Sequence, residues 1–258
     1  MDLASLLQWN LTLFLLIVAR WGGMIMLAPV FGARGVPRMI KLGLTACLAI
    51  ILYPVIAATN PVIPDQMLPY VALLVKEILV GLTVGFIIAT ITSIIQGAGF
   101  LIDYQMGFMM ANTIDPINGL QSPLTGNFLT IVATMLLLVT NTHHYLIAAM
   151  VKSYTYVPVN PSGLSIDYSY YAHLLMEIFT LAIQLAMPVI GAIVMADIGI
   201  GLLSRTVPQL NIFSVIFPSK LIFGLIILIL SVPFLSGTVS ELFNTTMSWV
   251  LELYRGWR

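Results

Sequence analysis

Long, uninterrupted apolar segments dominate the hydrophobic pattern of this chain. An α-helix needs about 20 apolar residues to cross the roughly 30 Å hydrocarbon core of a bilayer. Six segments meet that length, at 11–31, 39–58, 70–95, 126–150, 172–203 and 212–235. Because backbone polar groups cannot stay unpaired in lipid, helices are the expected structure of all of them. The pattern predicts an all-α membrane protein with about six long apolar helices.

Proline positions modify this outline at two places. In the fifth segment, 172–203, Pro188 predicts a bend in a helix that is long for one span. After Pro233, the residues 238–258 predict a short amphipathic helix at the membrane surface. The sequence shows neither an internal repeat nor a separate soluble domain, so we expect 1–258 to form a single integral-membrane unit.

The stretch between the third and fourth segments differs from the rest of the chain. Residues 96–127 contain no Lys or Arg and are rich in glycine, methionine, phenylalanine and amide side chains. The pair Asp115-Pro116 interrupts any helix there, because proline lacks the N–H that a helix requires. A flexible apolar segment inside a membrane protein indicates one of two roles. It lines or blocks a cavity, or it packs between helices as a re-entrant loop.

Composition excludes two large classes of protein. Of all residues, 60% are hydrophobic and only 8% are charged, and the mean hydropathy is +1.04. Soluble domains carry roughly 25% charged residues, so this chain has too few to cover a globule in water. The formal net charge is zero and no run of basic residues occurs, which excludes a nucleic-acid-binding face.

One basic residue lies inside an apolar segment. Arg20 is too far from either end of the first segment to reach the membrane surface easily. Because a charge within hydrocarbon is costly, we expect Arg20 to face other protein and to pair with an acid or with backbone carbonyls. The candidate acids are themselves embedded in apolar segments: Glu77, Glu177 and Asp197. The sequence does not choose among them.

Glycine spacing in the third segment indicates close helix packing. Gly81 and Gly85 lie four residues apart and therefore share one helix face. Small residues at this spacing let two membrane helices approach each other closely. The spacing alone predicts tight packing and no specific function.

Signals for enzymatic chemistry are missing from the sequence. His143 and His144 are adjacent, so on a helix they diverge by about 100° and cannot bind one ion together. No phosphate-binding glycine loop, nucleophile elbow or zinc-protease motif occurs. We expect no metal site, no cofactor and no catalytic residues, and hence a protein that is not an enzyme.

Five motifs in a fixed order resemble one family. They are Arg20 with MLAPVFGARGVPRMIKLGL at 26–44, KEILVGLTVGF at 76–86, GAGFLIDYQMGFMMANTIDP at 97–116, NTHHYLI at 141–147 and GLLSRTVPQLNIFSVIFPSKL at 201–221. Together they resemble the flagellar export-gate family FliR and its virulence-secretion counterpart SctT, and the flagellar branch most. Thr142 and Ile216 stand where this family commonly has glycine.

The resemblance implies an architecture and a set of partners. Residues 1–160 are expected to resemble FliP, with four helices, and residues 161–258 to resemble a FliQ helical hairpin. The expected role is a structural and gating subunit of the type III export apparatus that builds the flagellum. Expected partners are FliP, FliQ, FlhB, FlhA-like subunits, the lipid bilayer and unfolded export substrates. The expected location is the bacterial inner membrane, within the flagellar basal body.

The resemblance also implies particular site residues. A loop that plugs the pore matches the residues Met106, Gly107, Phe108, Met109, Met110, Asp115, Pro116 and Gly119. Methionine suits this task because its flexible side chain fills irregular space, and glycine gives the backbone freedom to move. A cytoplasmic loop expected to contact FlhB matches the residues Arg205, Pro208, Gln209, Asn211 and Lys220.

Two alternatives to the flagellar gate stay open at this point. A secondary transporter also uses buried charges and broken helices near the middle of the membrane. A virulence type III secretion gate would share the same motifs. The absence of an internal repeat and the scattered positions of the acids weigh against the transporter.

Overall fold

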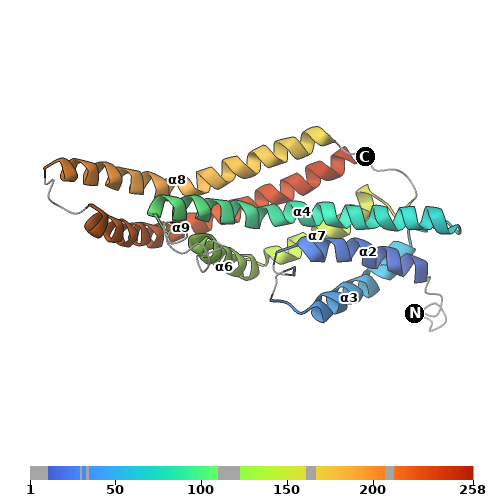
Figure 1. Ribbon diagram of the computed structural model, residues 1–258. Helices are drawn as coiled ribbons and strands as arrows, with labels where there is room; N and C mark the ends of the chain where they lie inside the picture. The colour runs from blue at the N-terminus through green and yellow to red at the C-terminus, as the bar shows by residue number, and fades with distance from the viewer. Residues whose placement is uncertain are drawn as a thin grey trace. The chain divides into compact units, whose positions relative to one another are not determined.

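The chain is all-α wherever the structure describes it. The computed structural model describes residues 11–29, 31–32, 35–109, 123–160, 167–206 and 212–257, without the side chains of 203–206 and 212–217. Within these ranges every regular element is a helix (Figure 1). The predicted fold class is confirmed.

Seven helices follow one another in the described ranges. They are α2 (Leu11–Leu27), α3 (Arg38–Ala57), α4 (Met67–Met106), α6 (Leu124–Val139), α7 (Thr142–Tyr156), α8 (Tyr168–Thr206) and α9 (Ile212–Gly256). Four of them, α3, α4, α8 and α9, are long and apolar enough to cross a membrane. The pair α6 and α7 adds a fifth span if it is counted as one, and α2 is a shorter apolar helix. The prediction of about six long apolar helices therefore agrees only loosely with the described residues, because α2 is short and the pair α6 and α7 is bent.

The fourth predicted segment, 126–150, is not one straight helix. It divides into α6 and α7, which meet at an angle of 75°. Asn141 stands at the break with a left-handed backbone, φ 56°. After glycine, asparagine is among the residues that adopt this conformation most readily. The prediction of a continuous helix here was wrong because an asparagine inside an apolar segment gives only a weak signal for a break.

Other helices run further than their apolar pattern indicated. Helix α4 has 40 residues and continues past Gln96 to Met106, so the beginning of the central stretch is helical. Helix α9 has 45 residues and passes through Pro233. The prediction of a separate amphipathic helix after that proline was wrong. Membrane helices tolerate proline because neighbouring groups can bond the carbonyl that it leaves free.

The chain forms two compact units, each assembled from distant segments of the sequence. The first contains Met1–Thr90, Asn141–Tyr171 and Asn244–Arg258, and the second contains Ile91–Thr140 and Ala172–Phe243. The division at residue 160 into regions resembling FliP and FliQ stays a prediction.

In the first unit, glycines bring α2 and α4 into backbone contact. A Cβ atom added to Gly81 would lie only 1.9 Å from the carbonyl oxygen of Arg20. One added to Gly85 would lie 2.9 Å from the carbonyl oxygen of Met24. These two positions on α4 therefore have no room for any side chain. Because they are four residues apart, both lie on the helix face that contacts α2. The close approach places Arg20 directly against α4.

Candidate functional site

A fully buried ion pair joins α2 to α4 in the first unit. Arg20 Nε donates to Glu77 Oε2 at 2.5 Å, and Arg20 Nη2 donates to Glu77 Oε1 at 2.9 Å. Both side chains have an exposed fraction of 0%. The guanidinium and the carboxylate thus meet in a two-bond arrangement that matches their planar shapes. Each charge is neutralised by the other, which is the condition for burying either.

The remaining donors of Arg20 hold the end of α7. Nη1 donates to Ser153 Oγ at 3.1 Å, and Nη2 also donates to the carbonyl oxygen of Val157 at 2.9 Å. The ring of Tyr154 lies against the guanidinium, with its centroid 4.1 Å from Cζ. The last carbonyls of a helix lack partners within the helix and carry partial negative charge. Arg20 supplies both a donor and a positive charge at that end, so three helices converge on one side chain.

The three acids proposed as partners of Arg20 have different surroundings. Glu77 is the one that bonds to it. Asp197 instead accepts a hydrogen bond from Lys220. Glu177 is exposed on α8, and no hydrogen bond or ion pair joins it to another described residue. The sequence could not select Glu77 because the choice depends on the backbone contact of α2 with α4.

In the second unit, a glycine ends α4 within the central stretch. Gly107 has a left-handed backbone, φ 89°. Its N–H donates to the carbonyl oxygen of Tyr104 at 3.2 Å. The N–H of Phe108 donates to the backbone carbonyl oxygen of Asp103 at 3.0 Å. This pair of bonds is the Schellman motif, in which a glycine terminates a helix. Helix α4 therefore ends before the pair Asp115-Pro116, which lies outside the described residues.

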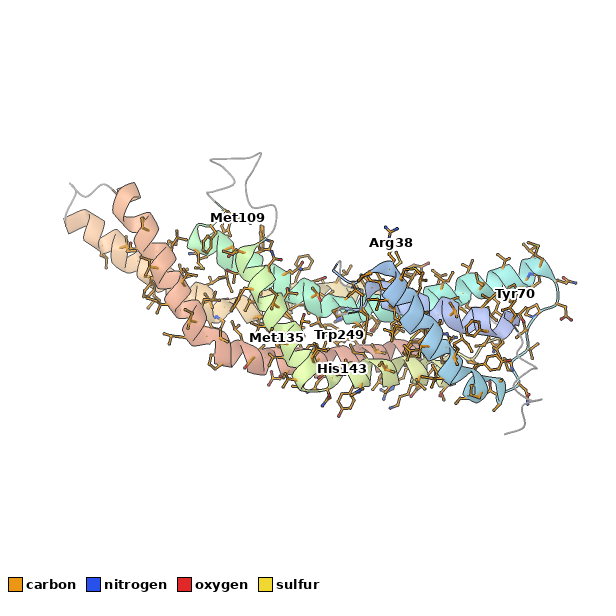
Figure 2. All side chains as sticks on the ribbon, turned by 90° about the horizontal axis from the view of Figure 1, so that it is seen from below. Arg38, Tyr70, Met109, Met135, His143 and Trp249 are labelled. Carbon is orange, nitrogen blue, oxygen red and sulfur yellow. The ribbon has the colours of Figure 1, made fainter. Side chains whose placement is uncertain are left out.

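The predicted plug residues fall into three groups. Met106 is the last residue of α4 and is fully buried. A Cβ atom added to Gly224 of α9 would lie 2.8 Å from its side chain, so Met106 anchors the helix end. Gly107, Phe108 and Met109 follow α4 directly, with Met109 labelled at that end (Figure 2). The others lie outside the described residues: Met110, Asp115, Pro116 and Gly119.

A buried carboxylate ties the two ends of the central stretch together. Asp103 in the last turn of α4 accepts hydrogen bonds from the backbone N–H of Thr125, at 3.0 Å, and from its hydroxyl. Asp103 is 1% exposed and Thr125 is 3% exposed. Thr125 lies in the first turn of α6, where free N–H groups and the helix dipole favour a negative charge.

Two glycines bring the same helix ends into backbone contact. A Cβ atom added to Gly99 would lie 2.1 Å from the Cα of Gly126. One added to Gly126 would lie 3.1 Å from the carbonyl oxygen of Gln96. We call the four residues Asp103, Thr125, Gly99 and Gly126 the base clamp. The base clamp fixes both ends of the segment 107–122 to each other.

A second ion pair joins α8 to α9. Asp197 Oδ2 accepts from Lys220 Nζ at 2.8 Å and from Gln105 Nε2, at the end of α4, at 3.1 Å. The side chains of Lys220 and Asp197 are 21% and 34% exposed. The expectation that Lys220 lies in a loop was wrong, because α9 already begins at Ile212.

The other residues of the expected loop are less completely described. The backbone of Arg205 is helical, since α8 continues to Thr206. Pro208, Gln209 and Asn211 lie outside the described residues.

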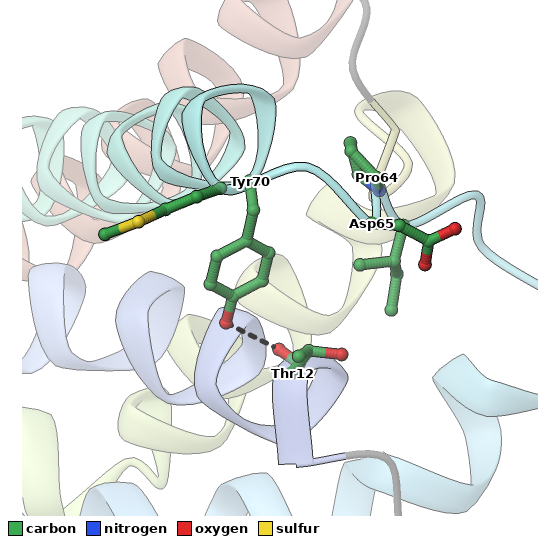
Figure 3. Close-up of a pocket in the computed structure, with 6 residues that line it drawn as sticks. Thr12, Pro64, Asp65 and Tyr70 are labelled. Atoms are coloured by element: carbon green, nitrogen blue, oxygen red, sulfur yellow. Dashed lines mark hydrogen bonds between the residues drawn. The ribbon is translucent and has the colours of Figure 1, made fainter.

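A pocket elsewhere in the first unit lacks the features of a chemical site. Its volume is about 290 Å³, and it is lined by Thr12, Ile63, Pro64, Asp65, Met67 and Tyr70 (Figure 3). The Tyr70 hydroxyl donates to the Thr12 carbonyl oxygen at 3.1 Å. Asp65 is the single charged group in this lining. Among the described residues, no group of three or more His, Cys, Asp or Glu side chains converges as a metal site would require.

Sequence reasoning missed the hydrogen bonds that join Asp103 to Thr125 in the base clamp. Asp103 is an acid inside an apolar helix, which is a signal for a buried function. It stands four residues before Gly107, the residue that ends α4. Its partner, Thr125, lies 22 residues further along the chain, and nothing in the local pattern links the two.

Known proteins resemble this chain over most of its length. The family model for "Bacterial export proteins, family 1" matches residues 11–246. The flagellar biosynthetic protein FliR of Bacillus subtilis (strain 168) is 34% identical over 244 residues, which cover 93% of each chain. FliR of Escherichia coli (strain K12) is 30% identical over 256 residues, covering 96% of this chain and 95% of that protein.

A translocation protein is similar over a somewhat smaller share of the chain. The Yop proteins translocation protein T of Yersinia pestis is 29% identical over 226 residues, covering 84% of this chain and 85% of that protein. The family match runs from the first residue of α2 through the other described helices and into α9. This chain belongs to family 1 of the bacterial export proteins.

Proposed function

We propose that this chain is a structural and gating subunit of the type III export apparatus that builds the bacterial flagellum. The chain is a multi-pass membrane protein of an export family, and its similarity to flagellar FliR proteins supports the flagellar system. It resides in the bacterial inner membrane and forms the export gate with FliP and FliQ. FlhB and FlhA-like subunits are further partners, and unfolded proteins pass through the assembly.

The base clamp is the observation that carries the gating role. A segment that closes a pore must yield to a passing chain and then return to its place. Asp103 and Thr125 hold its two ends together through buried hydrogen bonds. A loop with fixed ends can move at its centre without unwinding the helices beside it. The plug then comprises Gly107, Phe108 and Met109 with Met110, Asp115, Pro116 and Gly119, while Met106 serves as its anchor.

The end of α8 and the residues that follow it, 207–211, are the proposed contact for FlhB. Arg205, Pro208, Gln209 and Asn211 keep this assignment. Lys220 does not, since it bonds to Asp197 within the chain and supports α9 instead.

The virulence counterpart is the second candidate, because the Yop translocation protein T is nearly as similar as the flagellar relatives. It would use the same gate for a different set of exported proteins. Restoring motility to a bacterium that lacks its own flagellar subunit would support the flagellar system. Restored secretion through a virulence system alone would support the counterpart.

Purification tests the subunit role directly. The tagged chain, expressed with its neighbouring genes and extracted in mild detergent, is expected to elute in one large complex with at least two other membrane proteins. A monomer or homodimer that binds a small solute would contradict the proposal and would favour a transporter.

A further inference from the structure

One face of α8 carries a stripe of polar side chains. The stripe consists of the exposed residues His173, Glu177, Thr180 and Gln184. Their spacing of four, three and four places puts them on one side of the helix. The buried side of α8 lies opposite and consists of Leu174, Ala182, Leu185, Ala186, Val189 and Ile193. We call the four polar residues the α8 stripe.

The residues on either side of the α8 stripe are too apolar for a surface that faces water. Met176 and Phe179, which flank it, are 71% and 70% exposed. Ile183 and Met187 continue the apolar border and are also exposed. Contiguous large apolar side chains on an exposed face mark an interaction surface rather than a solvated one.

Lipid is an equally poor environment for the α8 stripe itself. Ionisable side chains in membrane helices face protein or a water-filled cavity, because hydrocarbon gives them no partner. The outer face of α9 shows what a lipid-compatible surface looks like in the same unit. Between residues 222 and 234 its exposed side chains are all apolar and include Ile222, Ile226, Ile229 and Leu230. The α8 stripe differs from that surface because it exposes the carboxylate of Glu177 and the amide of Gln184.

Among the described residues, only Thr180 of the α8 stripe has a hydrogen-bond partner within the chain. Thr180 donates to the carbonyl oxygen of Met176 on its own helix, at 2.9 Å. No hydrogen bond or ion pair connects Glu177 or Gln184 to another described residue. Further along the same face, a Cβ atom added to Gly191 would meet nothing within 4 Å. Polar side chains followed by a small residue are what packed membrane helices use at their contacts.

We propose that the α8 stripe docks a transmembrane helix of another subunit, one that presents a Lys or Arg to Glu177. The same helix supplies a hydrogen-bonding side chain to Gln184 and packs its apolar residues on Met176 and Phe179. A protein surface of this kind is the one environment that suits both the polar stripe and its apolar borders. The inference rests on the proposed function, because the helix belongs to a neighbouring subunit of that assembly.

Site-specific photocrosslinking in the purified complex identifies the occupant. A benzophenone side chain replaces Gln184, and a matched control replaces Ile229 on the lipid-compatible face of α9. We expect the probe at position 184 to crosslink to one other membrane subunit. The crosslinked residue should lie within about two helical turns, or about seven residues, of a Lys or Arg. We expect the Ile229 position to give no such product.

Charge reversal tests the electrostatic contribution. We expect Glu177→Lys to lower the yield of the complex at least about tenfold, which corresponds to about 1.4 kcal/mol. We expect Glu177→Gln to lower the yield less. If the basic residue found by crosslinking is replaced by Glu in the partner subunit, assembly of the Glu177→Lys variant should be restored. Unchanged thermal unfolding of the isolated variant shows that the loss lies in docking rather than in folding.

The outcomes separate this inference from the proposed function. A wild-type chain that purifies without other subunits overturns both. An intact complex in which Gln184 crosslinks to nothing, to a second copy of this chain, or to a helix without a nearby basic residue overturns the inference alone.

Discussion

The ion pairs of the two units differ in burial and in the number of bonds that hold them. In the first unit, Arg20 and Glu77 are fully buried and share two hydrogen bonds. In the second, Lys220 and Asp197 are 21% and 34% exposed and share one. Removing one partner of a buried pair costs about 3–5 kcal/mol because the other charge is stranded. Exposed pairs contribute only about 0–1 kcal/mol. The buried pair of the first unit therefore fixes α2 against α4, whereas the exposed pair of the second unit can break at little cost.

The largest expected effect is that of Arg20→Leu. The substitution strands Glu77 and removes the donors that hold the end of α7, so we expect a loss of about 3–5 kcal/mol of stability and little folded protein. Arg20→Lys keeps the charge and should be affected less. Replacing Arg20 and Glu77 together by leucine should recover some of the loss. Thermal unfolding in detergent measures all three variants, and equal stability of the leucine and lysine variants would refute the role given to Arg20.

Glycine substitutions should come next in size and should be severe in both units. Alanine at Gly81 would clash with the backbone of Arg20, and alanine at Gly99 with that of Gly126. Overpacking of this kind costs typically about 1–3 kcal/mol. Gly191→Ala is the matched control, since its Cβ atom meets nothing within 4 Å. If Gly81→Ala unfolds at the same temperature as the control, the close contact of α2 with α4 is wrong.

Loosening the base clamp should have a smaller effect on stability. Asp103→Ala leaves the N–H of Thr125 buried without an acceptor, at a cost of about 1–3 kcal/mol. Asp103→Asn keeps one acceptor oxygen and should cost less. Limited proteolysis of the central stretch should be faster in the alanine variant. Identical cleavage rates in the wild type and in Asp103→Ala would argue that the clamp does not hold the segment.

Breaking the exposed pair should have little effect on folding. Lys220→Met leaves Asp197 partly in contact with solvent and still bonded to Gln105. We expect a change of at most about 1 kcal/mol in the free energy of unfolding. A loss as large as that of Arg20→Leu would remove the contrast between the two units.

The smallest expected effect depends on pH and lies at the start of α8. Asp167 accepts hydrogen bonds from the N–H and hydroxyl of Ser169, and these lower its pKa from the ordinary 3.8. A lowered native pKa means that the ionised carboxylate stabilises the fold above pH 3.8 and that this stabilisation disappears as the pH falls through the native value. Asp167→Ala should therefore unfold slightly earlier than the wild type at neutral pH. The difference should vanish in strong acid, and a constant difference at every pH would contradict this role.

Composition and apolar length were enough to predict the fold class, because the membrane allows few structures. The break at Asn141 could not be predicted because asparagine inside an apolar segment gives only a weak signal, and the extension of α9 through Pro233 could not be predicted because membrane helices tolerate proline. For the site, the sequence indicated that Arg20 needs a partner but not which one. The partner of Asp103, Thr125, lies 22 residues further along the chain, and a contact over that separation leaves no periodic signal.

Gating by the central segment is the central claim, and ion leak through the assembled complex tests it most directly. Deleting 107–119 while keeping Asp103 and Thr125 should leave assembly intact and make the membrane permeable to small solutes. A variant of unchanged length, with Phe108, Met109 and Met110 replaced by serine, controls for chain length and should leak less. For the deletion variant, we expect small solutes to leak through a membrane that contains the complete complex. A complete complex with the leak of the wild type would show that this segment does not close the pore.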